Sequence, residues 1–224
     1  MRRRALVHIA GTGLLLLLMG ACERGNPGVS DSDITITGYQ IEGKLIDAFQ
    51  RPLVGVRVLL YYDIALLSAD SISRAYTPSV QGEIVTVNVK DTTGQVIRLL
   101  FAGPAPQDSD LYVFWDGRND SGNVVRSGIY TVSYAVASVV KKSYRLIVDG
   151  NQNAVTDTEG RFVIPGFDLP VGDVALYYDS ADAFVGQFQI TSDVFLRFVT
   201  PSFDRTFRIS LVKDKITNFS VVLN

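Results

Sequence analysis

Residues 111–134 read LYVFWDGRNDSGNVVRSGIYTVSY, and this stretch decides the fold class. From Tyr130 to Tyr134, apolar and polar residues alternate, which places them on opposite faces of an extended chain. Before that run, an Asp-Gly pair at 116–117 and a Ser-Gly pair at 127–128 are signals of tight turns. The stretch therefore predicts two strands, each with one buried face, joined by a loop of turns.

The same alternation recurs on both sides of this stretch. Valines alternate with polar residues over 85–90, and large apolar residues recur at every second position towards the end of 203–211. Short strands separated by turns are typical of β-sandwiches. A body of about 200 residues is more than one small sandwich needs, so the sequence predicts an all-β protein with two β-sandwiches. Helical turns are predicted only at 65–74 and 180–184.

The residue types that serve most catalytic sites are concentrated at the amino end. The single His, the single Cys and both Met lie within the first 22 residues. Without residues 1–21, the chain has no imidazole and only one thiol, that of Cys22. This excludes Ser-His-Asp and Cys-His nucleophiles, His/Cys zinc sites and internal disulfides. We therefore expect no enzymatic activity, no catalytic residue, no cofactor and no metal.

The net charge of the chain bears on which kinds of partner are expected. Basic and acidic side chains nearly cancel, 21 against 23, so a nucleic-acid partner is not expected. The expected partners are a membrane, reached through the amino end, and an envelope protein or a glycan whose identity the sequence does not specify.

The first 22 residues have the organisation of an export signal. Three Arg at 2–4 precede an apolar run, which ends in Met-Gly-Ala-Cys at 19–22. This ending resembles the lipobox of bacterial lipoproteins, with Met where Leu is usual. The resemblance implies that Cys22 becomes the first mature residue and carries lipid, and that several acyl chains anchor it durably. An uncleaved membrane anchor and a plain secretory signal are the alternatives, and all three readings predict export.

The lipoprotein reading sets the expected location and the first boundaries. Residues 1–21 are the signal peptide, and polar residues over 22–37, rich in Gly, Ser and Asp, form a flexible tether. Glu23 follows the cysteine in place of the Asp associated with inner-membrane retention. The expected location is therefore the cell envelope, at the outer membrane of a Gram-negative bacterium.

Two separated segments carry a second resemblance. Residues 39–63 read YQIEGKLIDAFQRPLVGVRVLLYYD, a glycine-containing strand, an Asp turn, and Pro-Leu-x-Gly-Val leading into another strand. A Thr-Asp-x-x-Gly-x-Phe hairpin follows only at 156–162, and a Leu-Pro-x-Gly turn at 169–172. These motifs resemble the carboxypeptidase regulatory-like domain, a non-catalytic transthyretin-like β-sandwich. The resemblance implies one such sandwich, split into 38–74 and 150–224.

The intervening residues, 75–149, carry a third resemblance. Residues 82–101 and 111–134 together resemble the FlgD-like Ig fold, with the hallmark Trp-Asp-Gly-x₄-Gly-x₄-Ser-Gly-x-Tyr. The resemblance implies an Ig-like β-sandwich inserted in a loop of the first, which a sandwich permits when its termini lie close together. The seven matching positions are Trp115, Asp116, Gly117, Gly122, Ser127, Gly128 and Tyr130.

Two loops are rich in Asp and Asn, whose side-chain oxygens are the kind of ligand that calcium prefers. The loop at 116–123 lacks the EF-hand spacing and its bidentate Glu, and Asx residues in tight turns usually bond their own backbone, so a turn is favoured. The run at 149–153 also lacks a carboxylate at its twelfth position and is predicted to be a linker between domains.

Two Tyr-Tyr-Asp runs supply the candidate ligand contacts. Neighbours on a strand face opposite ways, so one tyrosine of Tyr61/Tyr62 and one of Tyr177/Tyr178 should be buried and the other exposed. An exposed ring could stack on a sugar or on a protein partner. The competing interpretation is that tyrosine simply favours strands.

The sequence therefore predicts a non-enzymatic envelope lipoprotein whose β-sandwiches act as a structural, adhesion or assembly module. The alternative is a carbohydrate-binding surface lipoprotein that uses its exposed tyrosines.

Overall fold

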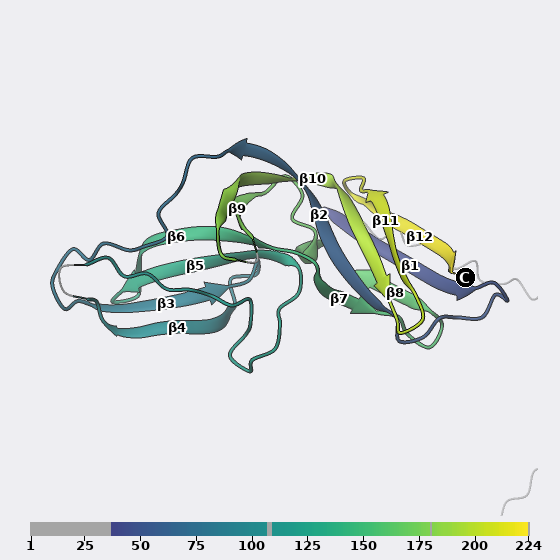
Figure 1. Cartoon of the computed structure of the whole chain (residues 1–224), viewed down its shortest axis with the longest axis horizontal. Helices are drawn as coiled ribbons and strands as arrows, with labels where there is room; N and C mark the ends of the chain where they lie inside the picture. The colour runs from purple at the N-terminus through teal and green to yellow at the C-terminus, as the bar shows by residue number, and fades with distance from the viewer. Residues whose placement is uncertain (1–36, 107–108, 180, 224) are drawn as a thin grey trace, which may run out of the picture. The chain divides into compact units, whose positions relative to one another are not determined.

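The computed structural model describes residues 37–106, 109–179 and 181–223 (Figure 1). Over these residues the protein is all-β, as predicted, with twelve strands and one turn of 3₁₀ helix, η1 (Gly166–Asp168). None of the described residues forms a helix that could cross a bilayer. The predicted signal peptide, Cys22 and all but the last residue of the predicted tether lie outside the described residues.

The twelve strands form two sheets. The larger sheet has the order β4-β3-β5-β6-β9-β10-β2-β7, with β11 also paired to β10, and the smaller has the order β12-β1-β8. In chain order the strands are β1 (Tyr39–Asp47), β2 (Arg57–Ser68), β3 (Ile84–Lys90), β4 (Val96–Pro104), β5 (Gly128–Val136), β6 (Val139–Val148), β7 (Asn151–Val155), β8 (Arg161–Ile164), β9 (Val174–Tyr178), β10 (Phe184–Val199), β11 (Asp204–Ser210) and β12 (Lys215–Leu223).

Pairing in the smaller sheet joins the beginning of the described chain to its end. Strand β1 pairs in parallel with β12 along its whole length and antiparallel with β8. The larger sheet is antiparallel except where β6 meets β9, in a parallel contact at Leu146 and Leu176. This contact makes one curled sheet out of strands from both halves of the described chain.

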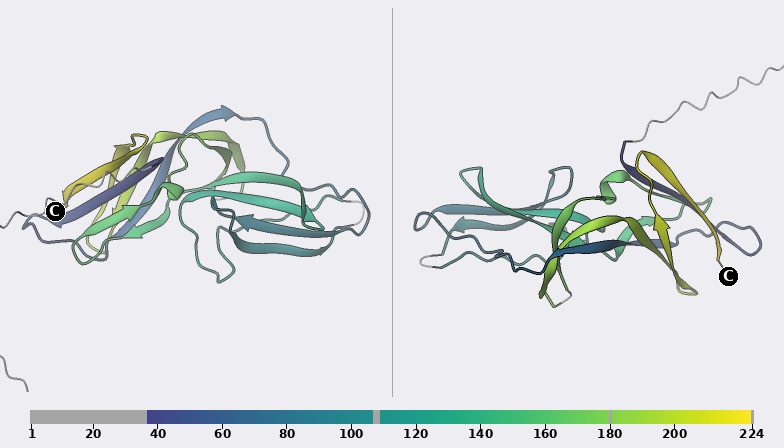
Figure 2. Two further views of the ribbon diagram at one scale, coloured as in Figure 1. Left: turned by 180° about the vertical axis from the view of Figure 1, so that it is seen from behind. Right: turned by 90° about the horizontal axis from the view of Figure 1, so that it is seen from above.

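Buried side chains gather in two hydrophobic cores. The first core lies between the smaller sheet and strands β2, β10 and β11. The second core lies under β3, β5 and β6 and is covered by residues that precede β3 or follow β4. Figure 2 shows the two groups of strands from behind and from above. Fully buried residues of the first core include Ile41, Leu45, Val58, Leu60, Ile164, Leu196 and Phe198, and those of the second include Val85, Val87, Val89, Val132 and Tyr134.

The alternation that predicted strands also predicted their buried faces. The three valines of β3 have no exposed surface, and on β5 the rings of Tyr130 and Tyr134 are buried. Strand β9 follows the predicted Leu-Pro-x-Gly turn at 169–172, and the turn after β9 closes with a hydrogen bond from Asp182 N to Asp179 O. Local periodicity is sufficient here because each strand has one face over a core.

Both predicted helical turns are wrong. Over 65–74, strand β2 continues to Ser68, where it pairs with β10, and the residues from 69 to 74 adopt no helix. The described part of 180–184 is the tight β9–β10 turn, and β10 begins at Phe184. Pairing of β2 with the sixteen-residue β10 provides the backbone hydrogen bonds of residues 65–68, so there the tertiary context overrides local propensity. Of the predicted linker at 149–153, only Asp149 and Gly150 lie between strands, because β7 begins at Asn151.

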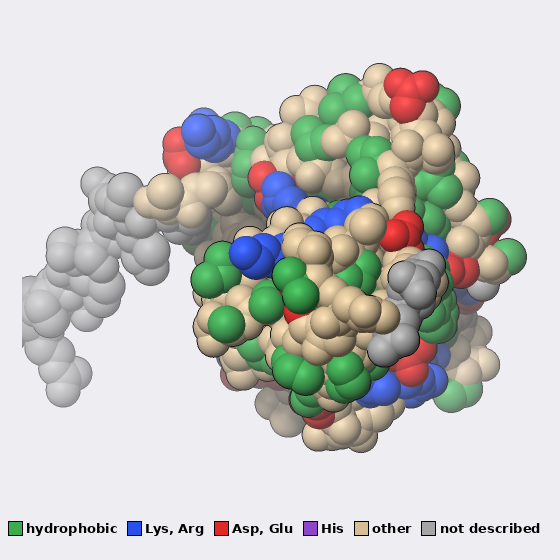
Figure 3. Space-filling view, turned by 90° about the vertical axis from the view of Figure 1, so that its left-hand side faces the viewer, with side chains coloured by type: hydrophobic (Ala, Val, Ile, Leu, Met, Phe, Trp, Pro, Cys, Tyr) green, Lys and Arg blue, Asp and Glu red, His purple; other side chains and the backbone are tan. Residues whose placement is uncertain are grey.

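The hairpin turn between β5 and β6 carries backbone strain. Its two central residues, Ala137 and Ser138, have φ angles of +48° and +67°, which identifies a left-handed turn usually built from Asn-Gly. Val139 and Val140 follow it and are about half exposed. Figure 3, which views this end of the molecule, shows apolar side chains interspersed with charged ones, as on ordinary protein surfaces.

Relieving that strain should stabilise the protein. We expect the double substitution Ala137→Asn/Ser138→Gly to raise the free energy of unfolding by about 1–2 kcal/mol, because both new residues adopt positive φ at little cost. The urea midpoint of the purified chain measures the change, and Ser138→Gly alone should give about half of it. An unchanged or lowered midpoint for the double variant would contradict this account of the turn.

Candidate functional site

The tryptophan of the seven-residue hallmark anchors the second core. Trp115 is 8% exposed, its ring packs edge-on against Tyr130 with centroids 5.1 Å apart, and its Nε1 donates to Arg118 O at 2.8 Å. The ring of this hallmark residue is buried in the core. The indole ring therefore fills the edge of the second core, and its N–H fixes the position of the loop that follows.

The loop at 116–123 is a set of turns, as favoured from the sequence. Asp116 Oδ1 accepts from Arg118 N, Asn119 Oδ1 accepts from Asn123 N, and Gly122 has φ +78°. Among the described residues, no group of three or more His, Cys, Asp or Glu side chains is placed to hold a metal ion.

The same loop also covers the outer edge of β4. Asp120 N donates to Ile97 O at 3.0 Å, and its Oδ1 accepts from Leu99 N at 3.2 Å. A free strand edge offers its backbone groups to other chains, and here a carboxylate and a turn occupy them. This edge-covering role of Asp120 was not predicted from the sequence.

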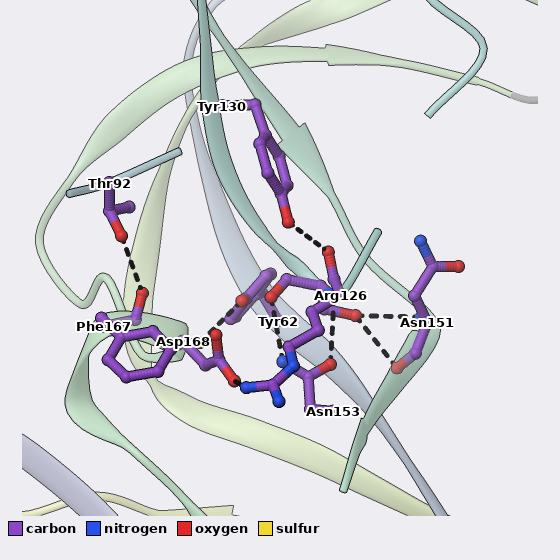
Figure 4. Close-up of polar contacts among 9 residues, drawn as sticks. Tyr62, Thr92, Arg126, Tyr130, Asn151, Asn153, Phe167 and Asp168 are labelled. Carbon is purple, nitrogen blue, oxygen red and sulfur yellow. Dashed lines mark hydrogen bonds and ion pairs between the residues drawn. The ribbon is translucent and has the colours of Figure 1, made fainter. Parts of the chain in front are cut away.

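Ser127 of the hallmark begins a buried polar junction between the two cores, and Figure 4 shows its partners Asn151 and Asn153. Its side chain has no exposed surface, and its Oγ donates to Leu60 O of β2 at 2.7 Å and accepts from Asn151 N of β7 at 2.9 Å. Asn153 completes the tie, because its Oδ1 accepts from Ser127 N and its Nδ2 donates to Ser127 O, both at 3.0 Å. The Asn153 side-chain amide of β7 thus pairs with both backbone groups of Ser127, just before β5, in the way that a neighbouring strand would.

An acidic residue extends this junction to η1. Asp168 is 5% exposed, its backbone O accepts from Tyr62 Oη at 2.7 Å, and its carboxylate lies 3.4 Å from Arg126. Burial raises the pKa of Asp168 above its ordinary value, while the Asn153 amide and Arg126 act in the opposite sense. Burial also raises the pKa of Tyr62 well above its ordinary value, so its phenol stays protonated as a donor.

The four predicted ligand tyrosines are less exposed than expected. Tyr62 is buried, as one member of its pair should be, but Tyr61, Tyr177 and Tyr178 are all only half-buried. The expectation of one exposed tyrosine in each pair is therefore wrong, and in the second pair neither Tyr177 nor Tyr178 is fully buried, because neighbouring residues of the fold partly cover these rings. The Tyr61 ring lies against Gly150, and the Tyr177 ring packs edge-on against Phe188.

The fourth tyrosine belongs to a cluster that sequence reasoning missed. Arg74 lies 3.8 Å from the ring centroid of Tyr178 and 5.0 Å from that of Tyr112, and it donates to both carboxylate oxygens of Asp182 at 3.0 and 2.8 Å. Tyr112 Oη donates to the same carboxylate at 2.9 Å. The hydrogen bond from Arg74 holds the pKa of Asp182 below its ordinary range.

The cluster is built from three segments that are distant in sequence. No local pattern connects Arg74, in the irregular segment before β3, to Asp182 in the β9–β10 turn. The geometry fixes the Tyr112 ring in one orientation through an ion pair and a hydrogen bond.

Comparison with known proteins identifies one part of the chain. A family model described as the FlgD Ig-like domain matches residues 64–138. The match begins and ends earlier than the predicted insert at 75–149, and it includes all seven hallmark positions. No curated protein and no solved structure matches the chain significantly. The Ig-like module is therefore found, over about a third of the chain's length.

Proposed function

We propose that this protein is an exported, lipid-anchored component of the bacterial cell envelope that works as a rigid structural or assembly module. The lipid attachment rests on Cys22 and the small residues before it. The outer membrane of a Gram-negative bacterium is the proposed location, with Glu23 as the supporting residue. A non-enzymatic role is supported by the lack of any His after residue 8 and of any Cys besides Cys22.

We further propose that the body is a carboxypeptidase regulatory-like sandwich split by the Ig-like module. Its two separate cores support this arrangement, since the first is built from strands at both ends of the described chain and the second mainly from the residues between them. The observation that carries the proposed rigid role is the set of hydrogen bonds that join Ser127 to Leu60, Asn151 and Asn153, which we call the Ser127–Asn153 tie. Four hydrogen bonds of 2.7–3.0 Å in a buried site hold β5 against β2 and β7, and so hold one core against the other.

Lipid attachment predicts a labelling result. In cells grown with labelled palmitate, the wild-type chain should yield a labelled band, and a Cys22→Ala variant should yield none, because the thiol that starts the mature chain is gone. The matched control is Met19→Leu, which restores the usual lipobox residue and should keep the label. An unlabelled wild-type band, or a labelled Cys22→Ala band, would contradict the lipoprotein proposal.

Carbohydrate binding is the second candidate function, and one observation favours it at a different place from the predicted one. Tyr61, Tyr62 and Tyr177 pack against neighbouring residues and offer little ring face. Tyr178 stacks on Arg74, but it also lines a pocket beside the exposed ring of Phe114. Any glycan site should therefore be sought around that pocket.

A further inference from the structure

Two exposed aromatic rings project from the stretch that leads into the hallmark. Along 111–115 the side chains alternate, with Leu111 and Trp115 buried and Tyr112 and Phe114 exposed by 49% and 54%. Residues at i and i+2 of an extended chain share a face, so both exposed rings lie on the outer side. Large aromatic side chains exposed as neighbours are costly in water and are characteristic of binding surfaces.

A pocket of about 190 Å³ is lined by Phe114, and Tyr112 is connected to it through Arg74 and Asp182, which also line it. Residues of β6 from 146 to 148 line it together with Phe114, Trp115, Gly117 and Tyr178. The charged residues of its lining are Arg74, Asp116, Asp179 and Asp182. Sites for drug-sized ligands span roughly 300–1,000 Å³, so this pocket suits a single ring, such as one unit of a longer chain.

The surface is organised before any ligand arrives. Tyr112 is held through Asp182 and Arg74, and Arg74 is in turn stacked on Tyr178. Asp116 and Asp179 each use Oδ1 to accept from the backbone of their own turns. Fixed side chains lose little conformational entropy on binding, which favours affinity.

Charge selects among possible ligands. Three carboxylates against the single guanidinium of Arg74 give the pocket a net negative charge. Anionic ligands are therefore repelled, while hydroxyl groups can donate to the carboxylate oxygens. Aromatic faces flanked by carboxylate acceptors match a sugar ring, which presents C–H groups on one face and hydroxyls at its rim.

We propose that Tyr112, Phe114 and the adjoining pocket bind a neutral glycan, with one sugar ring in the pocket and the chain lying across the two aromatic rings. This inference rests on the second candidate function and replaces its predicted tyrosines with a defined site. It does not depend on lipid attachment, which the palmitate experiment decides separately.

The chain contains its own reporter for this site. Trp115 is the only tryptophan in the sequence, and it lines the pocket. We would titrate the full-length protein, in a detergent without a sugar headgroup, with soluble neutral polysaccharides (β-glucan, xylan, galactomannan and mannan) and with polygalacturonate as the anionic probe. We expect at least one neutral polysaccharide to shift the Trp115 emission with saturation, and polygalacturonate to cause no shift.

Variants locate the binding surface. Phe114→Ala should weaken the neutral polysaccharide about tenfold, the loss expected for one aromatic contact, and Tyr112→Ala should weaken it similarly. Phe167→Ala is the matched control, since Phe167 is 53% exposed elsewhere, and it should bind like wild type. The proposal is overturned if no neutral polysaccharide shifts the emission, if Phe114→Ala binds unchanged, or if only a polylysine probe binds, which would assign the surface to a cationic protein partner.

Discussion

Replacing Gly160 by Ala should lower the free energy of unfolding by at least ~3 kcal/mol, the largest stability loss that we expect from a single added methyl group. Gly160 has φ +72°, and a Cβ there would lie 2.4 Å from Leu45 O and 3.2 Å from Leu53 N. Both atoms belong to the backbone of the smaller sheet and its following turn, so neither can rotate away. The hydrogen bond from Leu45 N to Gly160 O, at 2.8 Å, would be strained in the same step.

A second glycine separates the clash from the dihedral strain. Gly172 has φ +87°, but nothing lies within 4 Å of the position where its Cβ would be. Gly172→Ala should therefore cost only about 1 kcal/mol, from the positive φ alone. Urea unfolding of both variants, followed by circular dichroism, measures the difference. Equal losses at the two positions would show that Leu45 O does not restrict position 160.

The turn that contains Gly160 was readable from sequence because its signal is local. Asp157 Oδ1 accepts from the backbone N–H groups of Glu159 and Arg161, which closes the turn using residues at fixed spacing. The valines of β3 were predictable for a similar reason, since a period of two needs only one buried face. Patterns of this kind involve neighbours in the chain, and the structure confirms them.

The pairings that assemble the sheets were not readable in this way. Strand β1 pairs with β12, at the far end of the described chain, and Phe195 of β10 pairs with Tyr61 of β2. The Tyr61 ring lies against Gly150 and its Oη accepts from Arg197 Nη1 at 3.3 Å, so Tyr61 is partly covered where alternation alone predicted exposure of one tyrosine. Sequence alternation indicates that a face is buried or exposed to water, but contacts between distant segments decide how exposed the outer face remains.

Polar residues at the junction were misread for a different reason. Asn151 and Asn153 fall in a run of Asp, Gly and Asn that is typical of loops, yet they belong to a strand and hydrogen-bond Ser127. The Arg74 cluster was missed because its members are 38 and 70 residues apart along the chain. Buried polar ties depend on partners brought together by the fold, and composition alone does not identify them.

The Asn153 side chain should be the most costly amide in the junction to remove. In Asn153→Ala, Ser127 loses the partners of both its N–H and its C=O in a buried site, and we expect a loss of about 2–4 kcal/mol in the free energy of unfolding. In Asn153→Asp, the carboxylate still accepts from Ser127 N but cannot donate to Ser127 O. Asp168 lies in the same junction and would add like-charge repulsion, so this variant should also be destabilised at neutral pH.

The neighbouring residue on the same strand is the control. Gln152 is exposed, and Gln152→Ala should change the free energy of unfolding by less than ~0.5 kcal/mol, as surface substitutions usually do. Urea midpoints measure both variants, and amide hydrogen exchange locates the effect. In Asn153→Ala, exchange should accelerate at Ser127 and Asn151, whose amides take part in the tie, more than at Val87 in the centre of β3.

This pattern of exchange decides whether the junction is a rigid tie between the two cores. If the tie holds β5 against β7, its loss must open the junction before either core, because Val87 and Leu60 remain buried in separate clusters. Uniform acceleration over the described strands would mean that the two cores unfold as one cooperative unit with no special role for Asn153. Unchanged exchange at Ser127 would mean that its amide is protected by packing alone, and the proposed rigid structural module would lose its structural basis.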